Sequence, residues 1–281
     1  MNRFAYRRPA TLDQAFELKA ADPSAYFVAG ATDTLVKIKN GDIEPRALIS
    51  LRSIPELKGI ETGETVRIGS LTTISEIVED AELAKIFPVL AEAARQLGSR
   101  QIRNVATIGG NLCNCSPCAD TAPPLLVHEA RVKLAGRSGS REIPLSEFFE
   151  GPGQSCLATD EILEAVLIDR PAAGARGAFF KKGRVRMDLA IASLAALITL
   201  DGELCTRVRL AAGSVAPVCL RLTKAERHLE GNPLSPELVS EAAELAAGEV
   251  TPIDDVRASA IYRRRLVEVF TRRALAAIAG R

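Results

Sequence analysis

The chain has few aromatic residues and almost no net charge. Of its 281 residues only 4% are aromatic, none is Trp, and the formal net charge is +1 at pH 7. Proteins that bind single-stranded nucleic acid rely on aromatic stacking platforms and basic surfaces. The composition therefore argues against a nucleic-acid partner. The two histidines lie far apart in the sequence and predict no metal site.

Long apolar runs are also absent. The longest mostly apolar stretch, residues 189–200, is too short to span a bilayer, and the first ten residues, MNRFAYRRPA, lack the apolar core of a signal peptide. We therefore expect a cytoplasmic protein without membrane contact. In such a reducing compartment, clustered cysteines bind metals or do redox chemistry more often than they form disulfides.

Helix-like and strand-like patterns occur in both halves of the chain without strict alternation, which predicts an α+β fold. Thr73 and Glu76 match a capping box, and Gly98 lies where a helix would end. The small residues at 171–177 predict a domain boundary. The expected helices are 11–20, one beginning at Ile74, 87–97, 235–248 and 258–278, and the expected strands are 26–29, 47–51, 65–69, 128–134, 162–168, 190–200 and 208–212.

Residues 104–126 combine a Gly-Gly pair, three cysteines, an Asp and a Pro-Pro pair. This composition predicts a buried loop rather than a helix or strand. Within it, the glycines of TIGGN at 107–111 remove side chains where a ligand must approach the backbone. The ordinary alternative is a simple Gly-Gly turn.

A second glycine-containing segment, VAGATDT, occupies residues 28–34. Gly30 permits a turn whose backbone N–H groups converge, and Thr32 and Thr34 add hydroxyl groups, so the segment suits a pyrophosphate. The alternative is an ordinary strand–turn–helix connection with Asp33 as the helix cap. Neither segment matches GxGxxG or GxxxxGK[ST], which argues against a Rossmann NAD site and a P-loop ATP site.

The two glycine segments together are more specific than either alone. With FFKKGRVRMDLAIASLAA and ASAIYRRRLVEVFTRRAL they make the chain resemble the FAD-binding medium subunit of the molybdenum hydroxylases, the family of xanthine dehydrogenase, carbon monoxide dehydrogenase and 4-hydroxybenzoyl-CoA reductase. The resemblance covers nearly the whole chain. It implies an FAD-binding domain of the PCMH type at residues 1–171, with lobes at about 1–55 and 56–171, and a small α+β C-terminal domain of the CO dehydrogenase flavoprotein type at 175–281.

The resemblance also implies a set of FAD contacts. One side of the pyrophosphate would be wrapped by Val28, Ala29, Gly30, Ala31, Thr32, Asp33 and Thr34, and the other side would be held by Thr107, Gly109, Gly110 and Asn111. The remaining expected contacts are Asp120 at the ribityl or ribose hydroxyls, Ile162 or Leu163 beside the adenine or flavin, Leu97 in the same cofactor site, Lys181 at the electron-rich edge of the flavin, and Leu189 against the isoalloxazine.

Two positions depart from the family pattern. Ala31 replaces the second glycine of the usual AGGTD motif, and we expect its methyl group to be tolerated only if φ is negative there. Leu189 stands where some relatives have an aromatic residue, so it would pack on the flavin ring without stacking.

Four cysteines predict a further site. Cys113, Cys115 and Cys118 form C-x-C-x-x-C, and Cys156 lies in GPGQSCLATDE. Because four thiolates are what a 4Fe-4S cluster needs, we hypothesise that these residues bind one. The alternatives are that they are small buried side chains or zinc ligands. Cys205 and Cys219 are expected to lie in the core.

The expected function is that of an FAD-carrying subunit of a multi-subunit molybdenum hydroxylase. It would receive electrons from 2Fe-2S clusters of a small partner chain, downstream of a large molybdenum-cofactor subunit, and pass them to an acceptor such as NAD⁺. The alternatives are a free-standing flavin-dependent oxidoreductase with its own substrate pocket and a non-flavin scaffold. The basic stretch RRRLVEVFTRR near the C-terminus predicts a solvated helix face or a docking site for an acidic partner.

Overall fold

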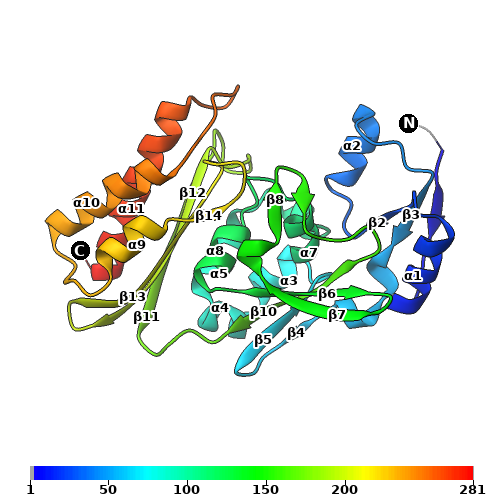
Figure 1. Cartoon of the computed structure of the whole chain (residues 1–281), viewed down its shortest axis with the longest axis horizontal. Helices are drawn as coiled ribbons and strands as arrows, with labels where there is room; N and C mark the ends of the chain where they lie inside the picture. The colour runs from blue at the N-terminus through cyan, green and yellow to red at the C-terminus, as the bar shows by residue number, and fades with distance from the viewer. Residues whose placement is uncertain (1–2, 281) are drawn as a thin grey trace.

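The computed structural model describes residues 3–280, and it confirms the α+β class with three main sheets. Figure 1 shows them side by side, with the N-terminal sheet at one end of the molecule and the C-terminal sheet near the other. Within the described residues no helix is long and apolar enough to cross a membrane.

The N-terminal sheet is small and parallel. Its strands run in the order β1-β3-β2. Two helices accompany it, and Thr11 caps the first by accepting from the N–H of Gln14 at 3.2 Å. The elements are β1 (Ala5–Arg7), α1 (Leu12–Ala21), β2 (Tyr26–Val28), α2 (Thr34–Asn40), β3 (Ala47–Ser50), and the 3₁₀ turns η1 (Leu51–Ser53) and η2 (Pro55–Leu57).

The second sheet is antiparallel, in the order β4-β5-β10-β6-β7, and packs on a layer of short helices. Thr73 and Glu76 form the predicted capping box at the start of α3. The strands are β4 (Ile60–Glu61), β5 (Thr65–Gly69), β6 (Arg131–Gly136), β7 (Gly139–Pro144) and β10 (Ile162–Asp169), with a separate hairpin of β8 (Phe149–Gly151) and β9 (Gln154–Ser155) after η3 (Leu145–Glu147). The helices are α3 (Ile74–Glu79), α4 (Ala81–Ile86), α5 (Pro88–Gln96), α6 (Arg100–Arg103), α7 (Ile108–Cys113) and α8 (Ala122–Val127).

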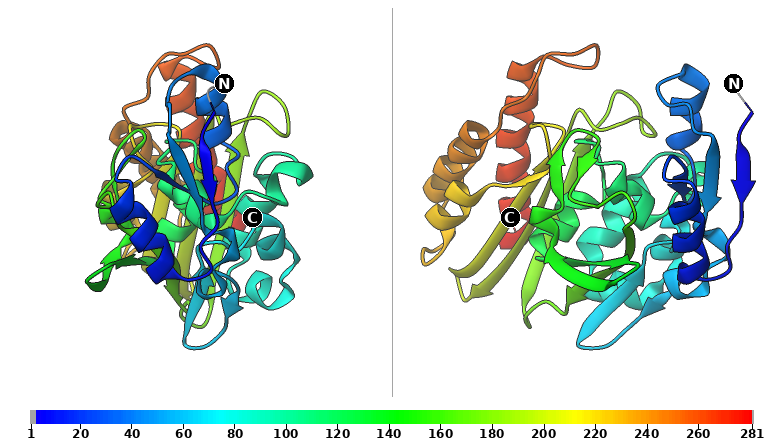
Figure 2. Two further views of the ribbon diagram at one scale, coloured as in Figure 1. Left: turned by 90° about the vertical axis from the view of Figure 1, so that its right-hand side faces the viewer. Right: turned by 45° about the vertical axis from the view of Figure 1, so that its right-hand side comes forward.

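The third sheet, in the order β11-β12-β13-β14, is buried on both faces. Along β12, Ala195 belongs to the core shared with α5 and α8, whereas Leu194 and Ala196 belong to the core shared with α10 and α11. This alternation explains the continuous apolar run of that strand. Figure 2 shows the helices of the C-terminal part covering the outer face of this sheet. The elements are β11 (Ala175–Lys182), β12 (Ala192–Asp201), β13 (Leu204–Gly213), β14 (Leu220–Arg221), α9 (Thr223–Leu229), α10 (Pro236–Glu249) and α11 (Ala260–Ala279).

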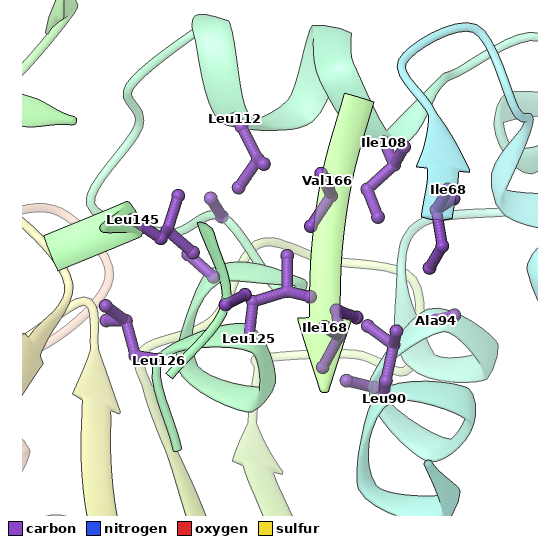
Figure 3. Close-up of a cluster of buried hydrophobic side chains, with 14 of the residues drawn as sticks. Ile68, Leu90, Ala94, Ile108, Leu112, Leu125, Leu126, Leu145, Val166 and Ile168 are labelled. Atoms are coloured by element: carbon purple, nitrogen blue, oxygen red, sulfur yellow. The ribbon is translucent and has the colours of Figure 1, made fainter. Parts of the chain in front are cut away.

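The prediction of a loop over residues 104–126 is wrong, because two short helices, α7 and α8, lie within it. Thr107 begins α7 as its N-cap, and the Pro-Pro pair lies in the first turn of α8, where missing N–H groups are tolerated. In Figure 3, Ile108 and Leu112 point from α7 toward Val166 of β10. The segment is therefore buried, as expected, but helical.

Other local predictions also fail. His128 ends α8 instead of opening a strand, and β6 begins at Arg131. The short strand β8 also lies outside the expected strands. Strands β7 and β11 escape prediction, and β11 overlaps the flexible-looking residues 171–177.

Candidate functional site

The two glycine segments lie against each other. A Cβ atom on Gly30 would be only 1.9 Å from the backbone oxygen of Val105, so the turn after β2 touches the chain just before TIGGN. A Cβ atom on Gly110 would lie 3.9 Å from that of Ala29. Lys37 of α2 donates to the side chain of Asn114 at 2.9 Å and links the same two segments. Glycine is required at position 30 because any side chain would enter the neighbouring backbone.

The backbone amides of the two segments differ in availability. In TIGGN the N–H groups of Ile108, Gly109 and Gly110 donate to the carbonyls of Thr72 and Ser70 and to the Thr107 hydroxyl. By contrast, none of the described residues accepts from the N–H groups at positions 30–33. Four consecutive N–H groups without a partner are available to a ligand. Free N–H groups are thus found at residues 30–33, whereas those of Ile108, Gly109 and Gly110 are already hydrogen-bonded.

Ala31 has a positive φ of 59°. The expectation that its methyl group requires a negative φ is therefore wrong. A left-handed conformation costs an L-residue roughly 1–2 kcal/mol, so the turn is strained at this position. Asp33 precedes α2 but its side chain makes no capping hydrogen bond to the helix, so the capping alternative is not what the structure shows. Thr32 donates to Asp33 at 3.3 Å, Thr34 begins α2, and Val28 ends β2.

A series of hydrogen-bonded polar residues leads from TIGGN to the C-terminal sheet. Asn111 accepts from the hydroxyl of Thr121 at 2.6 Å. The adjacent residue, Asp120, accepts from the ammonium group of Lys181 on β11 at 2.6 Å. Lys181 also donates to the carbonyl of Gln96 at 3.0 Å. Asn111, Asp120 and Lys181, three predicted contacts that are far apart in sequence, are thus connected.

The ion pair of Asp120 and Lys181 is almost completely buried, with the two side chains 5% and 4% exposed. Burial raises the pKa of the Asp120 carboxyl to about 6, although the charge and hydrogen bond of Lys181 lower it. The second carboxyl oxygen of Asp120, Oδ1, is buried without a hydrogen-bond partner. A buried polar atom without a partner is costly, and a hydroxyl group of a ligand would satisfy it.

The remaining predicted contacts lie at different depths. Leu97 caps α5 and is 8% exposed. Ile162 and Leu163 are both buried at the start of β10, and they belong to two different core clusters. Leu189 is 48% exposed in the loop between β11 and β12. The structure therefore connects residues 28–34, 107–111, 120 and 181 by contact, but it leaves Ile162 and Leu163 in the core and Leu189 at the surface.

The predicted cluster ligands Cys113, Cys115, Cys118 and Cys156 are free thiols, and they are not arranged as a metal site. Among the described residues, no group of three or more His, Cys, Asp or Glu side chains is placed to hold a metal ion. Burial raises the pKa of Cys113 to about 12 and that of Cys115 to about 11, so these two thiols are protonated at neutral pH. The structure does not show the 4Fe-4S site, because a cluster needs convergent thiols and the described residues provide no such group.

The other sequence expectations have mixed outcomes. Cys205 and Cys219 are buried, as predicted. His128 is buried with its ring edge-on to Phe87 at 4.9 Å, whereas His228 pairs with Glu241 at 2.9 Å. The basic stretch of α11 is not one solvated face, because Arg263 is 2% exposed.

Some contributors to the site escaped sequence reasoning. Ser70, Gln96 and Val105 take part through backbone carbonyls, which carry no residue-type signal. The hydroxyl of Thr121 donates to the side chain of Asn111, and the one sequence signal for Thr121 is its position next to Asp120.

Comparison with known proteins identifies the family. The model of the FAD binding domain in molybdopterin dehydrogenase matches residues 2–171, and that of the CO dehydrogenase flavoprotein C-terminal domain matches residues 178–278. The chain belongs to the family of FAD-binding subunits of the molybdenum hydroxylases.

Relatives and solved structures of this flavoprotein family agree with that assignment. The chain is 35% identical over 275 residues to the xanthine dehydrogenase FAD-binding subunit of Escherichia coli O157:H7, covering 96% of this chain and 94% of the relative. It is 32% identical over 275 residues to the carbon monoxide dehydrogenase medium chain of Hydrogenophaga pseudoflava, covering 97% and 96%. The structure of carbon monoxide dehydrogenase from the same organism superposes with a TM-score of 0.96 at 32% identity, covering 99% of this chain and 98% of the other. These relatives are subunits of oxidoreductases, and the predicted family and two-part fold are confirmed.

Proposed function

We propose that this flavoprotein subunit binds FAD along the line from residues 30–33 to Lys181 and relays electrons within a molybdenum hydroxylase complex. Electrons would arrive from 2Fe-2S clusters of a small partner subunit, after substrate oxidation on a large molybdenum-cofactor subunit, and would leave to an acceptor such as NAD⁺. When bound, FAD supplies the redox chemistry, and the protein supplies position and electrostatics.

The observation that carries this proposal is the complementarity between the site and the two ends of the cofactor. Four free N–H groups at residues 30–33 suit the negative charge of a pyrophosphate. The unpartnered Oδ1 of Asp120 suits a hydroxyl of the ribityl chain, and Lys181 provides a fixed positive charge beside it. Gly110 keeps side-chain atoms away from Ala29, next to residues 30–33.

The residues of this chain would bind and orient the cofactor. The ammonium group of Lys181, held by Asp120 and the Gln96 carbonyl, would favour negative charge on a reduced flavin. The free amide nitrogen of Asn111 would donate to the cofactor, since its oxygen already accepts from Thr121.

We also propose that the chain divides into the domains 1–171 and 175–281 expected from the sequence. The change of sheet between Asp169, which ends β10, and Ala175, which begins β11, supports this division. The 4Fe-4S cluster is left out of the proposal, and iron and sulfide analysis of the purified chain tests it. The cytoplasmic location remains a prediction.

The substitution Gly110→Ala tests the proposed site. The added methyl group would lie 3.0 Å from the Thr107 hydroxyl and would narrow the space beside Ala29 with little effect on the fold. We expect the purified unaltered protein to contain about one FAD per chain and the variant to have at least tenfold weaker FAD affinity, measured by the flavin absorption of the protein.

Gly248→Ala is the matched control, because a Cβ atom there meets open space. It should leave the FAD content unchanged. The proposal fails if the unaltered protein binds no FAD, or if Gly110→Ala binds it as tightly as the control. Co-purification with a large and a small chain would separate an electron-relay subunit from the alternative, a stand-alone oxidoreductase.

A further inference from the structure

One arginine is buried between the C-terminal helix and the third sheet. Arg263 lies near the start of α11, which packs on the outer face of that sheet (Figure 1), and it is only 2% exposed. Its Nε is buried without a hydrogen-bond partner. A buried charge is costly, and replacing a buried ion pair with apolar side chains is often neutral or stabilising. Stability alone therefore does not account for an arginine at this position.

The guanidinium group of Arg263 holds two strand ends at once. Its Nη1 donates to the carbonyl oxygen of Ile191 at 2.6 Å and to that of Ser214 at 3.0 Å. Ile191 directly precedes β12, and Ser214 directly follows β13. Because these two strands are antiparallel neighbours, the two positions lie at the same end of the strand pair. Arg263 therefore fixes that end of the sheet.

A carboxylate fixes the guanidinium group itself. The Nη2 of Arg263 donates to Asp255 at 2.7 Å. That carboxylate also accepts from the backbone N–H groups of Arg257 and Ala258, at 2.8 and 3.1 Å, in the loop before α11. The guanidinium group thus serves two carbonyl oxygens and one carboxylate. Several acceptors around one plane suit the rigid fork of arginine, which the ammonium group of a lysine does not reproduce.

Each of the two strand ends is bonded beside one member of the buried ion pair. The N–H of Ile191 donates at 2.6 Å to the carbonyl of the residue that follows Lys181. The N–H of Ser214 donates at 2.7 Å to the carbonyl of Pro117, three residues before Asp120. The guanidinium group thus reaches the main chain beside both members of the pair, each time through one intervening residue.

We infer that Arg263 is a positioning residue for the flavin, because it sets where the ammonium group of Lys181 lies beside Asp120. The inference rests on the proposed function, in which this ammonium group favours negative charge on the reduced flavin, and it adds a remote residue that controls the reduction potential. Without the guanidinium group, the ends of β12 and β13 lose their common anchor. The ammonium group then moves relative to the cofactor, and its attraction for negative charge weakens with distance.

The midpoint potential of FAD bound to the full chain tests the inference, by redox titration followed through the flavin absorption. We expect Arg263→Met to lose at least tenfold in its preference for reduced over oxidised FAD, which lowers the potential of a two-electron couple by about 30 mV. Leu275→Ala is the control, because this fully buried side chain lies on the same helix and its truncation leaves a cavity. The control should keep the potential of the unaltered protein.

A double variant separates positioning from a general loosening of the fold. Lys181→Met should lower the potential at least as much as Arg263→Met, and adding Arg263→Met to it should cause no further fall, because no ammonium group is left to position. Arg263→Lys, which keeps the charge but not the fork, should lower the potential in the same direction and replaces Arg263→Met if that variant does not fold.

Three results would overturn the inference: an unchanged potential in the Arg263 variant, an equal fall in Leu275→Ala, or the same further fall in the Lys181→Met background. In all three the chain still binds FAD, so the proposed function stands. An unaltered protein without FAD refutes the proposed function itself.

Discussion

The buried pair of Asp120 and Lys181 allows a quantitative test of the site. Removing one partner of a buried ion pair leaves an uncompensated charge, and such changes cost about 3–5 kcal/mol. We expect this full cost for Asp120→Asn, because the Lys181 ammonium would then keep only the Gln96 carbonyl as an acceptor. Lys181→Met should cost less, about 1–2 kcal/mol. The pKa of Asp120 is about 6, one unit below pH 7, so protonating this carboxyl in the variant costs at most roughly 1.4 kcal/mol, because loss of Lys181 raises that pKa further.

The double variant Asp120→Asn/Lys181→Met removes both charges. We expect it to be less destabilised than the sum of the single variants by about 2–3 kcal/mol. Urea unfolding of the FAD-free protein at pH 7, followed by circular dichroism because the chain has no Trp, measures all four free energies of unfolding. Coupled neighbours deviate from additivity, whereas independent sites add to within about 0.5 kcal/mol. An additive cycle would show that the two charges do not interact and would refute the reasoning.

Three further predictions concern single residues. Ala31→Gly should stabilise the FAD-free protein by about 0.3–1 kcal/mol, because relief of the positive φ outweighs the entropy of the added glycine; a less stable variant in urea unfolding would contradict this. Gly30→Ala should destabilise it by more than 2 kcal/mol in the same assay, since the methyl group meets the Val105 oxygen at 1.9 Å, and wild-type stability would show that the turn is looser than described. Burial lowers the pKa of His128 to about 4, below its unfolded value near 6.5, so its contribution to stability is present above pH 6.5 and is lost as the pH falls toward 4. His128→Phe should therefore lose less stability between pH 6.5 and 4.5 than the control His228→Phe, and equal losses would remove His128 as the cause.

Local side-chain chemistry was readable from the sequence, but contacts between distant segments were not. The capping box of Thr73 and Glu76 fixes where α3 begins, and it was found in advance because both partners lie within one turn. The strand β12 was also predictable, because its apolar residues form one continuous stretch of the sequence. By contrast, β11 escaped prediction because its apolar and basic residues do not alternate and its place in the sheet depends on pairing with β12.

The loop predicted over residues 104–126 shows a different failure. Its glycines and prolines lie near the first turns of α7 and α8, where breaking residues are tolerated, so composition alone gave the wrong element. Within the site, sequence reasoning named both segments but could not tell which of their N–H groups are free. Whether an N–H group is free depends on Ser70 and Thr72, which no local pattern connects to TIGGN.

The central claim is that the free N–H groups of residues 30–33 hold the pyrophosphate of FAD. Amide hydrogen exchange of the protein with and without FAD, resolved to single residues, tests it most directly. We predict strong additional protection at residues 30–33 on FAD binding and little change at Ile108, Gly109 and Gly110, whose N–H groups are already hydrogen-bonded. FAD-dependent protection at those three residues without any at 30–33 would contradict the account.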